Sequence, residues 1–86
     1  MKEKNALMLK YIGERIKSFR VERHISRESA AQELGISKRT LASYERGERE
    51  ITMKTLIKLA EIYNTTYTNL TNYENILDDM GNVIVI

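Results

Sequence analysis

The sequence has no cysteine, a single histidine and no long hydrophobic run, and each of these excludes a class of protein. Without cysteine there is no disulfide, no thiolate nucleophile and no cysteine-based zinc site, and the composition suits a reducing cytoplasm. His24 alone is too little for a metal site. No apolar run approaches the roughly 18 residues that span a bilayer, and the charged start of the chain is not followed by the apolar segment of a signal peptide. We therefore expect a cytoplasmic protein without a membrane segment, metal or cofactor.

The chain also has little from which to build an enzyme. It contains no glycine-rich phosphate loop, and no nucleophile stands beside a candidate base. Glu74, Asp78 and Asp79 are three carboxylates close in sequence, but such a group is usually a solvated face and not a metal site. We expect no catalytic residues.

Positive charge is absent from the last third of the chain. Residues 59–86 hold no Lys or Arg against four acids, a balance of −4, whereas residues 1–58 hold 14 Lys and Arg against eight Glu, a balance of +6. A protein with this asymmetry often presents a basic face to a polyanion, although charge alone fits ordinary solvation equally well. At 86 residues the chain is one small domain near the lower limit for a self-sufficient core, so a second copy is expected to complete it.

Apolar spacing predicts three helices that build a core. The first covers residues 6–23, where apolar residues recur at three- and four-residue steps. Its apolar residues are Leu9, Ile12, Ile16 and Phe19. Thr52 is placed to cap a helix with a broad apolar stripe that Asn64 ends, and Thr66 to cap a short helix within residues 65–71.

Between the first of these helices and the one that Thr52 caps, the sequence predicts two short helices joined by a tight turn. Ser26 has the form of an N-cap for a helix over residues 27–34, and Gly35 suits the left-handed residue that ends it. Ser37 is placed to cap a further helix over residues 38–46. The turn between the two helices is therefore three residues long.

The spacing of Ala31, Gly35 and Leu41 indicates that these helices cross closely. Such a crossing needs a small residue in the first helix, a positive-φ residue in the turn and a branched apolar residue in the second helix. With Leu41 turned into the core, Lys38, Arg39 and Ser43 lie on the outward side of the second helix.

The stretch "RESAAQELGISKRTLASYERG" resembles the helix-turn-helix of the Cro and phage-repressor type, often called the XRE family. The resemblance runs from about residue 12 to residue 70. It includes "IGERIKSFRVER" before the motif, and "YERGERE" and "TLIKLAEIYNTTYTNL" after it. It implies a mainly α, five-helix repressor-like DNA-binding domain over residues 1–71, with the helix-turn-helix at 27–46. The helix over 38–46 then enters the major groove, while the helix over 27–34 crosses the sugar-phosphate backbone.

By analogy with the family pattern, Lys38, Arg39 and Ser43 are the predicted base contacts, and Arg and Lys match guanine best. Phosphate contacts are expected from the surrounding frame. Those residues are Arg27, Ser37, Thr40, Tyr44, Arg46, Arg49 and Lys54. The family usually has glutamine where this chain has Arg27, so a charged contact replaces a neutral one. Arg20 and Glu45 match a family pair that forms an internal salt bridge, and we assign them to structure.

The apolar tail, residues 72–86, has two structural interpretations. Asp78 and Gly81 suit a turn that makes a short β-hairpin; the alternative is a helix over 72–80 followed by an extended segment. Either way the final four residues are apolar on both faces and should be covered. They are Val83, Ile84, Val85 and Ile86. They can pair with a second copy to form a homodimer, or add a strand to an antirepressor or toxin; a third reading is that the chain is a fragment whose strand continues in another domain.

These patterns together predict a sequence-specific, double-stranded DNA-binding transcriptional regulator that catalyses no reaction. We expect a dimeric repressor on a palindromic operator. The alternative is a protein-interaction module, such as an antitoxin or partner-binding subunit, that uses the helix-turn-helix as a scaffold.

Overall fold

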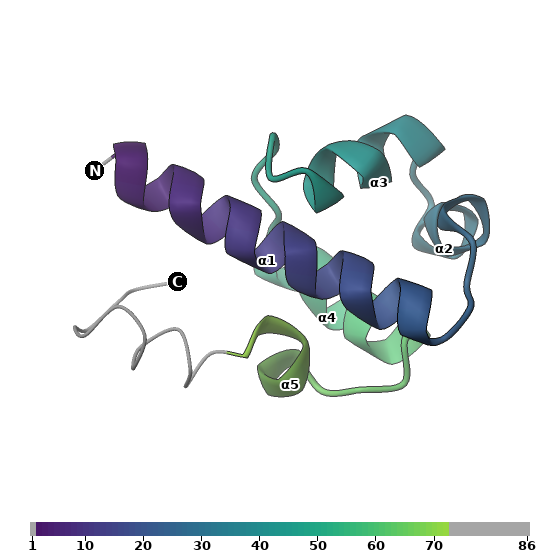
Figure 1. Cartoon of the computed structure of the whole chain (residues 1–86). Coiled ribbons are helices and arrows are strands. Elements are labelled where there is room, and N and C mark those ends of the chain that lie inside the picture. Colours follow the sequence, from purple (N-terminus) through teal and green to yellow (C-terminus); the bar gives the residue numbers. More distant parts are fainter. Residues whose placement is uncertain (1, 73–86) are drawn as a thin grey trace.

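The computed structural model describes residues 2–72, and within them every regular element is a helix (Figure 1). The helices are α1 (Lys2–Glu22), α2 (Arg27–Leu34), α3 (Lys38–Glu45), α4 (Met53–Ile62) and α5 (Tyr67–Thr71). The prediction of a mainly α, five-helix domain is confirmed. The predicted C-terminal hairpin or strand lies outside the described residues.

Short polar side chains begin four of the helices at the predicted positions. Each accepts a hydrogen bond from the backbone N–H three residues further on, which satisfies a donor that the helix itself leaves unpaired. These N-caps are Ser26, Ser37, Thr52 and Thr66. Local sequence therefore sets where α2 to α5 begin.

The bounds of α1 and α3 differ from prediction, and α1 ends at Glu22, one residue earlier than predicted. The first helix begins at Lys2, four residues earlier than predicted, because lysine and glutamate are good helix formers even without an apolar stripe. The third helix ends at Glu45, and Arg46 is its C-cap, followed by Gly47 with a φ of +72°. Asn64 has the expected left-handed conformation, with a φ of +55°.

The core draws side chains from all five helices. In Figure 1 the long α1 passes in front of α4, with α2 and α3 grouped together and α5 below. The first helix packs against α3 and α5, while α4 packs against α2 and α5. The buried core residues are Ile12, Ile16, Ala30, Ala31, Leu34, Leu41, Leu56, Leu59, Ala60, Tyr63 and Leu70.

Arg15 of α1 and Arg23, which directly follows it, fasten the C-terminal helices to α1. Arg15 donates from Nε to the Leu70 carbonyl oxygen at 3.3 Å, and Arg23 donates from Nε to the carbonyl of Tyr63. Both guanidinium groups lie over the Phe19 ring, 5.1 and 4.7 Å from its centroid. Because these contacts combine hydrogen bonding with cation–π attraction, we assign both cations to the fold.

Candidate nucleic-acid interface

The turn between α2 and α3 has the geometry that the sequence predicts. Gly35 has a φ of +80°, and its N–H bonds to the carbonyls of Ala31 and Gln32, while Ile36 N–H bonds to the Ala31 carbonyl at 3.0 Å. Ala31 and Leu41 are buried, with 2% and 0% of their surface exposed. The small residue, the positive-φ glycine and the branched core residue therefore hold the two helices as a close pair.

The N-terminal part of α3 presents two cations to solvent. Lys38 and Arg39 are both exposed, because Lys38 is the first residue of α3 and Arg39 lies on the side of the helix opposite the buried Leu41. Ser43 is half-buried, and its hydroxyl donates to the Arg39 carbonyl oxygen at 3.1 Å. Since its proton is used in this way, Ser43 offers acceptor lone pairs to a neighbouring group.

A chain of polar side chains stands beside these cations. The Ser37 hydroxyl accepts from the Thr40 backbone N–H at 3.0 Å and lies 2.9 Å from the Thr40 hydroxyl. Arg49 Nη1 donates to the same Thr40 oxygen at 3.4 Å. The structure thus brings three of the predicted phosphate contacts together, and it orients Arg49 from the following loop toward the start of α3.

The other predicted phosphate contacts lie in different surroundings. Arg46 and Glu48 form an exposed ion pair with 3.0 Å between Nε and Oε2. This hydrogen bond lowers the pKa of the Glu48 carboxyl and raises that of the Arg46 guanidinium. Tyr44 packs against the core and is half-buried, whereas Lys54 is exposed on α4. Lys54 and Arg46 are therefore accessible cations, and Tyr44 has a partly structural role.

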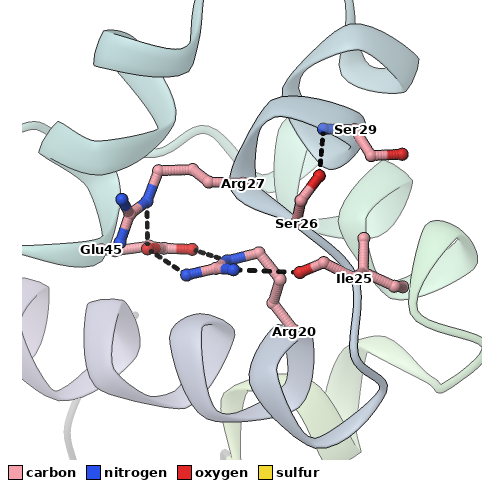
Figure 2. A network of polar contacts seen from close by, with 6 residues as sticks. All are labelled: Arg20, Ile25, Ser26, Arg27, Ser29 and Glu45. Atoms are coloured by element: carbon pink, nitrogen blue, oxygen red, sulfur yellow. Dashed lines mark hydrogen bonds and ion pairs between the residues drawn. The ribbon is translucent and has the colours of Figure 1, made fainter.

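One buried carboxylate joins α1, α2 and α3 (Figure 2). Arg20 donates from Nε to Glu45 Oε2 at 2.7 Å and from Nη2 to Oε1 at 3.2 Å, so the Arg20–Glu45 pair expected from the family resemblance is present. Arg20 also donates from Nη1 to the Ile25 carbonyl oxygen at 3.0 Å. Hydrogen bonding to Glu45 raises the pKa of Arg20, against the opposing effect of burial.

Arg27 has a partner that the sequence did not reveal. Its Nε donates to Glu45 Oε1 at 2.9 Å, the same oxygen that Arg20 Nη2 contacts (Figure 2). The Glu45 side chain is 2% exposed and that of Arg27 is 31% exposed. The cation predicted to contact phosphate is therefore tied to the buried network on one edge and open to solvent elsewhere.

Sequence reasoning also missed the role of Gly13. A β-carbon at this position of α1 would lie 2.5 Å from the Tyr44 carbonyl oxygen and 2.7 Å from that of Glu45. α1 and the end of α3 thus approach so closely that only glycine fits at position 13. A glycine inside an otherwise regular helical pattern is a signal of such an approach, but it does not identify the neighbour.

Two further observations concern other kinds of site. Over residues 2–72, no group of three or more His, Cys, Asp or Glu side chains is placed to hold a metal ion. None of the helices in that same part of the chain is long and apolar enough to cross a membrane.

Comparison with known proteins gives matches over most of the domain. A family model described as helix-turn-helix matches residues 16–70. Control protein C.SmaI of Serratia marcescens is 31% identical over 70 residues, which cover 81% of this chain and 83% of that protein. The cryptic phage CTXphi transcriptional repressor RstR of Vibrio cholerae is 34% identical over 56 residues, 65% of this chain and 50% of the repressor.

A solved structure has the same fold. The crystal structure of an HTH_3 family transcriptional regulator from Vibrio cholerae superposes with a TM-score of 0.75 at 29% sequence identity. The match covers 87% of this chain and 43% of that one, so this chain spans less than half the length of that regulator.

Proposed function

Because the chain belongs to the helix-turn-helix family, we propose that it is a cytoplasmic, sequence-specific regulator of transcription that binds double-stranded DNA. The observation that carries this proposal is the exposed pair Lys38 and Arg39 at the start of α3, on a helix that Leu41 anchors in the core. An α-helix fits the major groove, and its N-terminal side chains reach furthest into it. The names of the two relatives, a control protein and a phage repressor, support regulation by DNA binding.

We assign base contacts to Lys38, Arg39 and Ser43. The fork of Arg39 matches the O6 and N7 acceptors of guanine, and Lys38 matches the same atoms as a point charge. The free lone pairs of Ser43 suit the amino group of cytosine or adenine. Each half-site should therefore contain guanine.

We assign phosphate contacts to residues around these three side chains. The Ser37–Thr40–Arg49 chain is held together before DNA arrives, so less side-chain entropy is lost on binding. Arg27 lies at the start of α2, where backbone N–H groups also favour an anion. The remaining assigned contacts are Tyr44, Arg46 and Lys54.

We further propose a homodimeric repressor on a palindromic operator. Two copies related by a two-fold axis place their two α3 helices in successive major grooves. We assign the pairing surface to Val83, Ile84, Val85 and Ile86, which are apolar on both faces in the sequence. The same segment would serve the alternative function, a module that docks an antirepressor or toxin by strand addition.

Selection of bound sequences from a random duplex library tests the function. The expected result is an enriched palindrome with guanine in each half-site, and an affinity that falls as salt concentration rises because bound cations release counterions from DNA. An enriched site without two-fold symmetry would contradict the dimer. Absence of both enrichment and salt-dependent duplex binding would overturn the DNA proposal and leave the protein-interaction module.

A further inference from the structure

We propose that Glu45 is a positioning residue, which holds Arg27 so that the terminal nitrogens of its guanidinium meet a DNA phosphate. This inference rests on the proposed function and deepens it. The family resemblance assigns Glu45 only an internal pairing with Arg20. In this chain its carboxylate is shared with a second guanidinium at the start of α2 (Figure 2).

The charges of this network do not balance. One carboxylate lies between two guanidinium groups, which leaves a net charge of +1 in a cluster where Glu45 and Arg20 are 2% and 9% exposed. The Arg27 side chain, at 31% exposure, is the member that reaches solvent. A partly desolvated cation without a full counter-charge attracts an anion more strongly than a solvated one does.

The geometry of the Arg27 guanidinium determines which of its nitrogens can contact a phosphate. Arg27 donates to Glu45 from Nε, and the two terminal nitrogens lie on the other edges of the same rigid plane. Fixing Nε on a buried oxygen therefore fixes the direction of those nitrogens. A phosphate presents acceptors suited to such a fork, and this contact would lie beside the backbone-crossing helix α2.

A lysine at position 27 would carry the same charge without this geometry. Its ammonium is a point charge at the end of a flexible stem, so pairing with Glu45 would draw the only charged group inward. Arg27→Lys therefore separates positioning from charge, while Arg27→Gln removes the charge. Glu45→Gln removes one negative charge, so the net charge rises by one, but it replaces the carboxylate that holds Arg27 with a neutral, weaker acceptor.

The experiment is a salt titration of binding to a random-sequence duplex, followed by fluorescence anisotropy. Lys58→Ala is the matched control, since Lys58 is an exposed cation on α4 outside the assigned interface. We expect Arg27→Gln to lower affinity about tenfold and to reduce the slope of log K against log salt by about 1. We expect Arg27→Lys to behave like Arg27→Gln, and Lys58→Ala to keep the wild-type slope.

The direction in which Glu45→Gln changes DNA affinity tests the proposal independently. Positioning predicts a loss of affinity of roughly fivefold although the net charge rises, whereas simple electrostatics predicts a gain. Circular dichroism shows whether each variant is folded, so that only folded proteins are compared. The Arg27 variants, at a partly exposed site, carry the test by themselves if Glu45→Gln does not fold.

The same titrations separate a failure of positioning by Glu45 from a failure of DNA binding itself. Wild-type affinity and slope in Arg27→Lys would overturn positioning by Glu45, and an unchanged slope in Arg27→Gln would overturn the phosphate contact itself. In both cases the wild-type protein still binds DNA with a salt dependence. No salt-dependent binding by the wild type would overturn the proposed function and this inference with it.

Discussion

Gly13 of α1 lies directly against the backbone of Tyr44 in α3. A β-carbon at Gly13 would come within 2.5 Å of the Tyr44 carbonyl oxygen, and the backbone of Glu45 blocks the neighbouring space. The last turn of α3 thus packs on α1 through its main chain. This contact sets the distance between the core helix and the surface that we assign to DNA.

Gly13→Ala should therefore destabilise the protein, by about 1–3 kcal/mol of unfolding free energy. In a helix interior this substitution normally stabilises by roughly 0.5–1 kcal/mol, so the sign of the change is itself informative. Urea denaturation followed by circular dichroism measures it. Ser18→Ala, at an exposed position of the same helix, is the control and should not destabilise. A more stable Gly13→Ala protein would show that the two helices separate without cost.

Arg20→Ala should cost about 3–5 kcal/mol, because removing one member of a buried ion pair leaves the other poorly compensated. We expect the lower part of this range, since Arg27 stays on Glu45. The measurement is again urea denaturation. Glu48→Ala breaks the exposed Arg46–Glu48 pair and should leave the midpoint unchanged, because solvent screens that pair. Equal midpoints for both variants would argue against a stabilising role of the buried pair.

Tyr63→Phe should change how stability depends on pH at the alkaline end. The Tyr63 side chain is fully buried, and burial, with a smaller effect of Glu45, raises its pKa above the ordinary value of 10.0. The unfolded chain therefore loses this proton first. The stability that the neutral phenol represents is fully present below about pH 10 and is lost above it, by at most about 1.4 kcal/mol per pH unit.

Thermal unfolding of wild type and Tyr63→Phe from pH 8 to pH 11 provides the comparison, because the other titrating groups cancel in the difference. Over residues 6–72, no group is within hydrogen-bonding distance of the buried Tyr63 hydroxyl. Below pH 10 we therefore expect the variant to be as stable as the wild type or slightly more so. Parallel stability curves above pH 10 would contradict the raised pKa.

Arg39→Ala should weaken operator binding by about 1–3 kcal/mol and relax preference at one base pair, since this side chain is assigned to a base edge. Arg49→Ala should weaken binding to all sequences and reduce the salt slope by about 1, because it is assigned to phosphate. Anisotropy titrations on operator and random duplexes distinguish the two. The base-reading assignment fails if Arg39→Ala lowers affinity for both duplexes equally.

Deletion of residues 83–86 should shift the protein toward monomer in sedimentation velocity and weaken binding to an operator with two half-sites. Binding to a single half-site should remain, since the assigned contacts all lie before residue 55. The physical reason is that a dimer gains affinity by tethering its second reading helix near the second half-site. An unchanged sedimentation profile would favour partner docking over dimer formation.

Much of the frame could be predicted from the sequence because it depends on local chemistry. Ser26, Ser37 and Thr52 cap helices through side chains that reach only three residues along the chain, so their identity and position suffice. Gly35 and Asn64 take up left-handed conformations for equally local reasons. The burial of Ala31 and Leu41 followed from helical spacing.

The roles of the arginines could not be predicted in this way. Arg15, Arg23 and Arg27 are alike in sequence, yet the first two bond to backbone carbonyls 40 or more residues away and the third shares a buried carboxylate with Arg20. Long, charged side chains meet partners that only the packing of helices brings within reach.

The sequence by itself determined the five helices, their caps and the exposed cations of α3, because these depend on side-chain periodicity and hydrogen bonds over a few residues. Only the tertiary structure decided that Gly13 seats α3 on α1 and that Glu45 joins Arg20 to Arg27. These contacts depend on distances between segments far apart in the chain, which no local pattern encodes. The tertiary structure therefore determines which cations stabilise the fold and which remain on the surface.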